Sequence, residues 1–169
     1  MINIGILTVS DKGSKGLRED KSGPLIGEMI QGTGVREKYE IVPDEKDIIS
    51  AKLIEWAEGG KVDIILTNGG TGLSARDVTP EATLAVIDRS VPGIAEAMRA
   101  KSVEKTPTAM LSRAVAGQRG QCLIINLPGS AKAVRECLEA ILPVLPHAVE
   151  IIKGTFTEHD IRNRVEGRG

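Results

Sequence analysis

Three short runs of aliphatic residues constrain the fold of this chain most strongly. They span Ile2–Val9, Val62–Thr67 and Cys122–Leu127, and each is nearly continuous in Ile, Leu and Val. Strands covered by helices on both faces have this composition, because neither side of such a sheet meets water. Segments with helical spacing separate the runs, for example Ile48–Ala57, which ends at Gly59-Gly60. The pattern predicts an α/β sheet with helices on both faces.

Proline, glycine and serine indicate where further elements begin and end. Helix starts are expected at Ser22-Gly23-Pro24, at Thr79-Pro80 with Thr79 as the cap, at Pro92 and at Ser130, and a last helix should end near Lys153. Two more strands are expected at Lys38–Val42 and Ser112–Gln118, the second turning at Arg119-Gly120 to form a hairpin with the Cys122 strand. The predicted fold is a three-layer α/β/α sandwich with a mostly parallel sheet and one antiparallel strand.

The length of 169 residues is that of a single domain. No repeat or linker divides the chain, so residues 1–154 are expected to form one α/β domain followed by a polar tail over residues 155–169. Cys122 and Cys137 lie in apolar segments without close spacing, which indicates buried free thiols in a reducing compartment.

Composition argues against several classes of partner. The chain has 22 Lys and Arg against 23 Asp and Glu, a net charge of −1, which is not the basic excess of a nucleic-acid or membrane-surface binder. Aromatic residues are only 2% of the chain, too few for stacking on single-stranded bases. No segment approaches the about 18–20 apolar residues of a membrane span, and the N-terminus lacks the basic start of a signal peptide. We expect a cytoplasmic protein that binds neither nucleic acid nor membrane.

The segment Thr67–Pro80 is the strongest candidate for binding an anion. Gly69, Gly70 and Gly72 would let backbone N–H groups converge on a phosphate, and the helix predicted to start at Pro80 would add its positive end. The segment matches neither the Walker pattern nor GxGxxG, so it does not indicate an ATPase or a dinucleotide fold. A flexible turn remains the alternative interpretation.

A second loop of similar design, Asn126–Ser130, follows the Cys122 strand. Asn126 and Ser130 offer side-chain hydrogen bonds, and the next helix offers its N-terminus. On its own this motif is weak, because Pro, Gly and Ser are common in strand-to-helix turns. Two such loops at one edge of a parallel sheet, where ligands of open α/β folds bind, are more informative than either loop alone.

Asp44 and Asp77 follow strands at the same predicted edge. A carboxylate beside a phosphate is favourable only with a divalent cation between them, and Mg²⁺ held by one or two carboxylates plus substrate phosphates is the usual solution. The alternatives are a helix cap before Glu45 for Asp44 and, for Asp77, a local turn hydrogen bond to the helix start at Thr79-Pro80. Ser10 and Asp11 follow the first strand, where capping or turn roles are slightly favoured.

The charged run Lys12–Lys21 indicates a solvated loop. A less favoured alternative is a mobile lid that brings Lys or Arg to phosphates.

At these residues the chain resembles the molybdopterin adenylyltransferase family of the MogA/MoaB type. The resemblance runs from Val9-Ser10-Asp11 to Asn126-Leu127-Pro128-Gly129, and its most specific motif is the glycine loop ending in Arg76-Asp77-Val78-Thr79-Pro80. It also includes the motifs Asp20-Lys21-Ser22-Gly23-Pro24, Pro43-Asp44-Glu45, Pro92-Gly93 and Leu111-Ser112-Arg113. Asn68 departs from the Thr or Ser expected at that position.

The resemblance implies the same α/β/α fold and a reaction in which Mg²⁺-ATP transfers AMP to the terminal phosphate of molybdopterin. It implies catalytic and metal-binding roles for Asp44 and Asp77. It further implies nucleotide binding by Ser10, Asp11, Asn68, Gly69, Gly70, Thr71, Gly72 and Ser74, and binding of pterin or phosphate by Ser112, Arg113, Asn126, Leu127, Pro128, Gly129 and Ser130. A homotrimer is implied too, for which the Ile94–Met98 helix face is a candidate interface, and so are contacts with other proteins of the cofactor pathway.

Two other functions stay open on the sequence. The domain could bind molybdopterin or a partner protein without catalysis, although retention of Asp44 and Asp77 weighs against this. It could also be a nucleotide pyrophosphatase of the competence-damage type, which the absence of a second domain in 169 residues disfavours.

Overall fold

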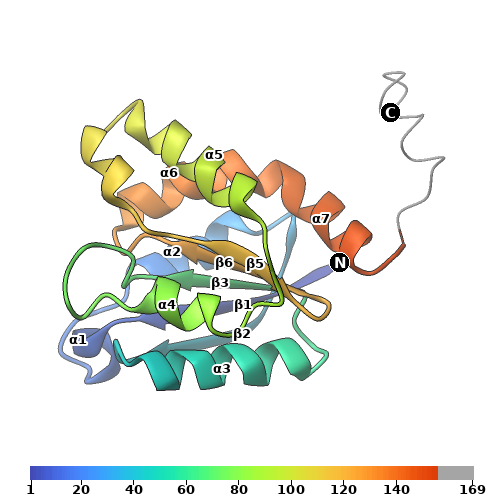
Figure 1. The fold of residues 1–169 in the computed structure, drawn as a ribbon, viewed down its shortest axis with the longest axis horizontal. Helices are drawn as coiled ribbons and strands as arrows, with labels where there is room; N and C mark the ends of the chain where they lie inside the picture. Colours follow the sequence, from blue (N-terminus) through green and yellow to red (C-terminus); the bar gives the residue numbers. More distant parts are fainter. Residues whose placement is uncertain (156–169) are drawn as a thin grey trace.

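The computed structural model describes residues 1–155, which form a six-stranded sheet with the order β2-β1-β3-β6-β5-β4 (Figure 1). The strands are β1 Ile2–Val9, β2 Gly34–Val42, β3 Ile64–Asn68, β4 Arg89–Ser90, β5 Ala116–Arg119 and β6 Cys122–Leu127. The helices are α1 Asp11–Ser14, α2 Ser22–Met29, α3 Lys46–Glu58, α4 Thr79–Leu84, α5 Pro92–Val103, α6 Ala131–Ile141 and α7 Leu145–Ile152, with short 3₁₀ helices η1 Pro107–Leu111 and η2 Leu142–Val144.

The sheet confirms the predicted mixture of strand directions. Strands β2, β1, β3 and β6 are mutually parallel, while β5 pairs antiparallel with both β6 and β4. The three aliphatic runs are the central strands β1, β3 and β6, and nearly all of their side chains are buried. The carboxyl ends of these strands therefore meet at one edge, where α1 and the long loop before α4 lie (Figure 1).

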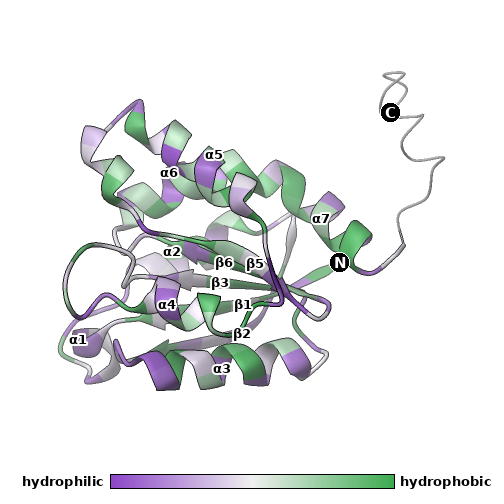
Figure 2. Ribbon diagram, viewed as in Figure 1, coloured by the Kyte–Doolittle hydropathy of each residue, from purple (hydrophilic) through white to green (hydrophobic). Residues whose placement is uncertain are grey.

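Two apolar cores, one on each face of the sheet, explain the three layers. One face packs against α2, α5, α6 and α7 through residues such as Ile26, Met98 and Leu138. The other packs against α3 and α4 through residues such as Leu53 and Ala82. Figure 2 shows this distribution, with hydrophobic strands inside and hydrophilic stretches along the outer helices. The predicted α/β/α sandwich is therefore confirmed.

Several predicted boundaries were wrong where local signals were weak. Strand β2 begins at Gly34 rather than Lys38, because its first half is a polar edge strand that pairs with β1 from Ile2 onward. The hairpin strand begins at Ala116 rather than Ser112. The charged run after Ser10 is not only a loop, since its start forms α1. The two-residue β4 and the 3₁₀ helix η1 have no counterpart in the predicted pattern.

Two predictions about helices need correction. Thr79 does not cap α4, because the cap residue is Val78 and the Thr79 hydroxyl donates instead to the Gly69 carbonyl at 2.9 Å. The Ile94–Met98 face is not an exposed interface, because both side chains are buried in the core between α5 and the sheet. By contrast, Ser130 caps α6 as predicted, accepting a hydrogen bond from the Ala133 N–H.

Cys122 and Cys137 are free and buried, as expected. The polar tail predicted for residues 155–169 lies, apart from Thr155, outside the described residues. Within residues 1–155, no helix has the length and apolar character needed to cross a membrane.

Candidate active site

A cleft of about 670 Å³ opens at the carboxyl edge of the parallel strands. The ends of β1 and β3, the start of α6, and the loop before α2 all contribute to it. Its lining includes eight of the predicted site residues: Ser10, Asp44, Asn68, Gly69, Gly70, Asp77, Gly129 and Ser130. The structure therefore brings the two anion-binding loops and both candidate catalytic carboxylates to one place. No aromatic side chain is among the residues that line the cleft.

The glycine loop is tightly packed rather than flexible. Gly69 and Gly70 have φ values of 95° and 66°, a region that side-chain-bearing residues avoid. A Cβ at Gly69 would collide with the Val9 carbonyl, and one at Gly70 with the Thr79 hydroxyl. The loop is also held to its surroundings by main-chain hydrogen bonds from Gly69 to Leu127 and from Thr79 to Gly70.

Three amides of the glycine loop, those of Gly70, Thr71 and Gly72, have no hydrogen-bond acceptor within residues 1–155. The N–H of Gly69 is engaged by the Leu127 carbonyl at 3.2 Å and cannot serve. Of the three, Gly70 lines the cleft while Thr71 and Gly72 do not, so the Gly70 amide is the one placed to meet a ligand there.

Asp44 is held at the cleft by a reciprocal pair of hydrogen bonds with Asp11. The Asp11 N–H donates to Asp44 Oδ2 at 2.8 Å, and the Asp44 N–H donates to Asp11 Oδ1 at 3.0 Å. Asp44 is not the cap of α3, since that position is Glu45. Burial raises the pKa of Asp44, and the nearby charges of Asp11 and Asp77 add to the increase.

Asp77 lies in the glycine loop and is fixed by that loop. Its Oδ2 accepts from the Ser74 N–H at 3.1 Å, and Gly72 leaves no room for a Cβ beside the same oxygen. Arg113 braces the loop from outside, donating to the carbonyls of Gly72 at 2.8 Å and Asp77 at 2.7 Å and pairing with Glu81. The side chain of Asp77 thus forms a local turn bond with Ser74, not the bond to the Thr79-Pro80 helix start that was predicted, and the carboxylate lines the cleft.

Asp20 is a cleft residue that the site prediction omitted. Its Oδ2 accepts from the hydroxyls of Thr8 at 2.5 Å and Tyr39 at 2.7 Å, and its Oδ1 from the amides of Ser22 and Gly23. Burial by itself raises the pKa of Asp20, but these hydrogen bonds outweigh it and the pKa is lowered.

The Asp20 network also reaches a predicted site residue. Thr8 accepts from the Asn68 side-chain amide at 2.9 Å, so the network connects the ends of β1 and β3 with the start of α2. The signal in the sequence was the motif Asp20-Lys21-Ser22-Gly23-Pro24, which carried the family resemblance without an assigned role.

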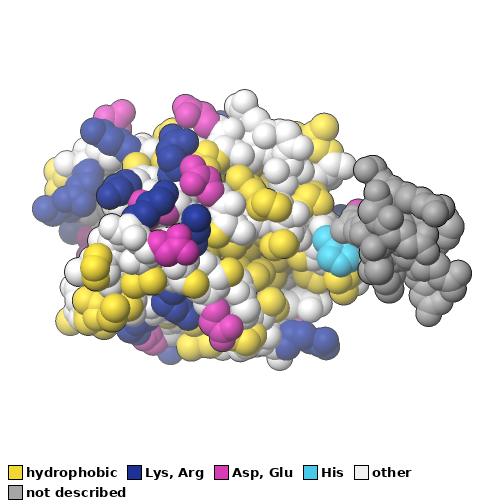
Figure 3. Space-filling model, turned by 90° about the horizontal axis from the view of Figure 1, so that it is seen from above, with side chains coloured by type: hydrophobic (Ala, Val, Ile, Leu, Met, Phe, Trp, Pro, Cys, Tyr) yellow, Lys and Arg dark blue, Asp and Glu magenta, His cyan; other side chains and the backbone are white. Residues whose placement is uncertain are grey.

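A shallower groove of about 420 Å³ continues the cleft between α2 and α6. Its lining holds three cations, Lys21, Lys132 and Arg135, and three carboxylates, Glu19, Asp20 and Glu28. Seen from the side of α5 and α6, Lys and Arg side chains gather toward the end of the molecule that holds the cleft, with Asp and Glu side chains among them (Figure 3). The groove is therefore mixed in charge, like the chain as a whole.

The remaining predicted site residues do not line the cleft. They are Asp11, Thr71, Gly72, Ser74, Ser112, Arg113, Asn126, Leu127 and Pro128. Asn126 is fully buried, donating to the hydroxyls of Thr67 and Thr83 and accepting from the Val115 N–H, so its polar atoms hold β6 to β3 and α4. Leu127 belongs to the apolar core, and Arg113 is committed to the loop. The side chains of Asn126, Leu127 and Arg113 therefore support the site rather than face it.

The donor set at the cleft fits a magnesium ion assisted by substrate. Asp44 Oδ1 and Asp77 Oδ1 accept no hydrogen bond from any residue between 1 and 155, so each carboxylate has one oxygen available. Over the same residues no cluster of three or more His, Cys, Asp or Glu could hold a metal by itself. A Mg²⁺ ion here would complete its coordination with water and phosphate oxygens, as it usually does.

A glycine loop and two carboxylates that meet in a cleft at the carboxyl edge of a parallel sheet define an α/β protein of the kind that binds its ligand at this edge. Residues 5–147 match the family model described as a probable molybdopterin binding domain, and the chain belongs to this family of molybdenum cofactor biosynthesis proteins.

Individual relatives agree over nearly the whole chain. A molybdopterin adenylyltransferase of Helicobacter pylori strain J99 is 45% identical over 165 residues, covering 96% of this chain and 94% of the relative. The crystal structure of the molybdopterin biosynthesis enzyme MoaB from Thermus thermophilus superposes with a TM-score of 0.86 at 55% identity, covering 91% of this chain and 98% of that one. The tungsten cofactor synthesizing protein MoaB from Pyrococcus furiosus gives a TM-score of 0.82 at 41% identity, covering 90% and 97%.

Proposed function

We propose that this protein is a molybdopterin adenylyltransferase that transfers AMP from Mg²⁺-ATP to the terminal phosphate of molybdopterin. The observation that carries the proposal is the convergence of Asp44, Asp77 and the glycine loop on one cleft. The identity of 45% to an enzyme of that name, over 94% of its length, supports the same activity.

The chemistry joins two anions, so charge neutralisation and positioning dominate the barrier. The phosphate oxygen of molybdopterin attacks the α-phosphorus of ATP, the new P–O bond forms, and the bond to pyrophosphate breaks. Mg²⁺, when bound, neutralises charge on the phosphates. Asp44 and Asp77 each offer it one available oxygen, while the unbonded amide of Gly70, which lines the cleft, would orient a phosphate oxygen. No covalent nucleophile is required.

Cations on the extension of the cleft are candidate phosphate contacts. Lys21, Lys132 and Arg135 lie there beside Glu19, Asp20 and Glu28, so individual side chains, rather than an excess of positive charge, would contact a polyphosphate. Adenine and pterin rings would rest on backbone and aliphatic groups, because the cleft lining contains no aromatic side chain.

The test replaces Asp77 by Asn and follows adenylylated pterin by chromatography with Mg²⁺-ATP. We expect the variant to lose transfer and keep the wild-type fold, since the Asn amide oxygen can still accept from the Ser74 N–H. Asp47→Asn, an exposed carboxylate on the first turn of α3 outside the cleft, is the control. Transfer at the wild-type rate in Asp77→Asn would refute the catalytic assignment.

The two alternative functions give different results in the same assay. A non-catalytic molybdopterin-binding module would bind the pterin without ATP turnover, and a pyrophosphatase would hydrolyse ADP-ribose. The retained carboxylates disfavour the first, and alignment over nearly the full length of an adenylyltransferase disfavours the second.

The proposal extends to assembly and location. We propose a cytoplasmic homotrimer that contacts other proteins of the cofactor pathway. In place of the buried Ile94–Met98 face, exposed apolar side chains near the cleft edge are candidates for the subunit interface, namely Leu73, Met110 and Leu111. Sedimentation analysis of the wild-type chain tests the trimer directly.

A further inference from the structure

Arg76 lies in the glycine loop next to Asp77, where a positively charged side chain would be expected to bind phosphate. In the structure, Arg76 contacts two carboxylates instead. Its Nε donates to Asp11 Oδ2 at 3.0 Å and its Nη2 to Asp11 Oδ1 at 2.9 Å, a two-point contact, and Nη2 also reaches Glu45 at 3.1 Å. Arg76 does not line the cleft but a separate depression beside it. Its charge is committed to carboxylates and is not available to a phosphate.

Asp11 is the other half of this contact, and it also faces away from the cleft. Both of its carboxylate oxygens are bound by Arg76, and Oδ1 additionally accepts from the Asp44 N–H. The hydrogen bond from Arg76 is the main cause of the lowered pKa of Asp11. These contacts leave Asp11 without a direct role toward a nucleotide.

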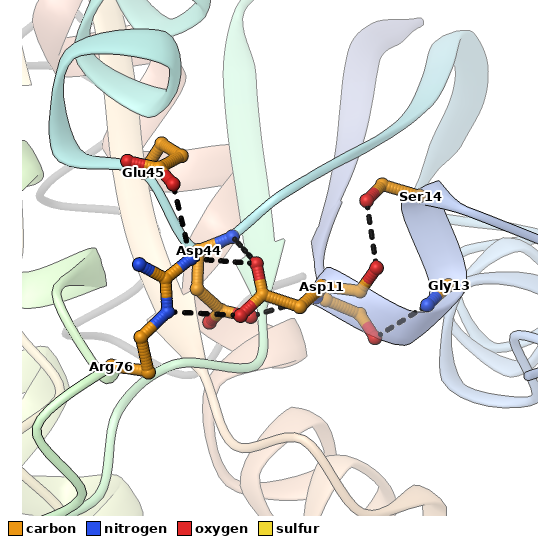
Figure 4. A network of polar contacts seen from close by, with 7 residues as sticks. Asp11, Gly13, Ser14, Asp44, Glu45 and Arg76 are labelled. Carbon is orange, nitrogen blue, oxygen red and sulfur yellow. Dashed lines mark hydrogen bonds and ion pairs between the residues drawn. The ribbon is translucent and has the colours of Figure 1, made fainter. Parts of the chain in front are cut away.

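The register of the sheet explains why Asp11 meets Asp44. Val9 of β1 pairs with Val42 of β2, so Asp11 and Asp44 lie equally far beyond the paired strand ends. The main chains stay connected there through the Ser10 N–H and the Val42 carbonyl at 2.8 Å. Figure 4 shows the resulting chain of contacts, from Arg76 through Asp11 to Asp44, with Glu45 beside it.

We infer that Arg76 and Asp11 are positioning residues, which fix the carboxylate of Asp44 opposite the loop that carries Asp77. The contact joins the glycine loop after β3 to the turns that follow β1 and β2. A two-point Arg–carboxylate contact restrains orientation as well as distance. The inference rests on the proposed function, because Asp44 is the group whose position matters for transfer.

A double-mutant cycle tests the inference. We expect Asp11→Ala and Arg76→Ala each to lower kcat roughly 10- to 100-fold, as a displaced catalytic group does, while KM for ATP stays within about twofold. The double variant should be no slower than the slower of the two single variants, because each single substitution already breaks the same Asp11–Arg76 contact. Arg76→Lys should recover part of kcat, since it keeps the charge without the two-point geometry. Lys101→Ala, which breaks a surface ion pair with Glu104 on α5, is the control for loss of an exposed pair.

Other outcomes contradict the inference. A large rise in KM for ATP in Arg76→Ala, with effects that multiply in the double variant, would make Arg76 a direct phosphate ligand. Unchanged kcat in both single variants would make the contact an ordinary surface ion pair.

A structural readout separates this inference from the proposed function. Crystal structures of the single variants should show Asp44 turned from its present position and the hydrogen bond between its carboxylate and the Asp11 N–H lost. An unmoved Asp44 overturns the inference whatever the turnover. A displaced Asp44 in a protein whose wild type transfers no AMP overturns the function and leaves the positioning role standing.

Discussion

The carboxylate of Asp44 and the α-carbon of Gly70 are so close that a Cβ at position 70 would lie 3.1 Å from Asp44 Oδ1. The same atom would collide with the Thr79 hydroxyl, which holds the Gly69 carbonyl. The loop after β3 and the turn after β2 therefore pack directly against each other. The absence of a side chain at position 70 lets the catalytic candidate and the anion-binding loop lie together.

Replacement of Gly70 by Ala should damage both stability and transfer. The φ of 66° costs an L-residue about 1–2 kcal/mol, and the overlap with Thr79 and Asp44 adds about 1–3 kcal/mol. Gly16→Ala is the matched control, because Gly16 has a φ of 70° and nothing within 4 Å of an added Cβ. Denaturant unfolding of both variants isolates the overlap. Equal losses of unfolding free energy in Gly70→Ala and Gly16→Ala would show that the loop shifts to accommodate the added Cβ at no cost.

Asp44→Asn should reduce transfer by roughly 100-fold or more while leaving the fold intact. An amide oxygen can still accept from the Asp11 N–H, but it binds Mg²⁺ more weakly than a carboxylate does. Initial rates measured across a Mg²⁺ titration should show a higher metal requirement. Normal rates with an unchanged metal requirement would reduce Asp44 to a structural residue.

Asp20→Asn should lower the free energy of unfolding at pH 7 by about 1–3 kcal/mol, because an amide cannot accept all of the hydrogen bonds that the carboxylate receives. The folded-state pKa of Asp20 is lowered, so its contribution is complete above the unfolded value of about 3.9 and disappears as the pH falls through the folded value. In a plot of unfolding free energy against pH, the acid limb is the part below the unfolded pKa of Asp20. Along it, the unfolding free energy of the variant should fall less steeply with decreasing pH than that of the wild type.

Glu37→Gln serves as the control for Asp20, since Glu37 is exposed on the edge strand β2. Identical acid limbs for wild type and Asp20→Asn would show that the Asp20 network contributes nothing to stability in acid.

The thiol of Cys122 should resist alkylation in the native protein. Burial raises its pKa to about 12, and the nearby charge of Asp63 adds to the increase, so the reactive thiolate is scarce at about pH 8. Cys137 is also buried with a raised pKa. Iodoacetamide labelling followed by mass spectrometry should show fast reaction only in denaturant. Equally fast labelling of the native chain would contradict the described core.

The layers of the fold and the place of the cleft could be predicted from local sequence patterns. A run of aliphatic residues indicates a strand that is buried on both faces of a sheet, and clustered glycines indicate that the backbone approaches its neighbours closely. Both signals are visible in the sequence because they depend only on residues that follow one another in the chain. The central strands, the glycine loop and the cleft positions of Asp44 and Asp77 could be predicted for this reason.

The pairing of polar groups around the cleft depends on how distant segments pack together. Asp11 and Arg76 are 65 residues apart, and Asn126 bonds to Thr67 across 59. No local pattern encodes such pairs, since they depend on strand register and loop packing. Asp11, Arg113 and Asn126 therefore hold the site together by hydrogen bonds to its loops and strands, although the family resemblance implied that they bind ligand, while Asp20 lines the cleft. A polar residue near a strand end can be predicted to form hydrogen bonds. Whether those hydrogen bonds go to a ligand or to other parts of the protein depends on the neighbours that the tertiary fold places beside it.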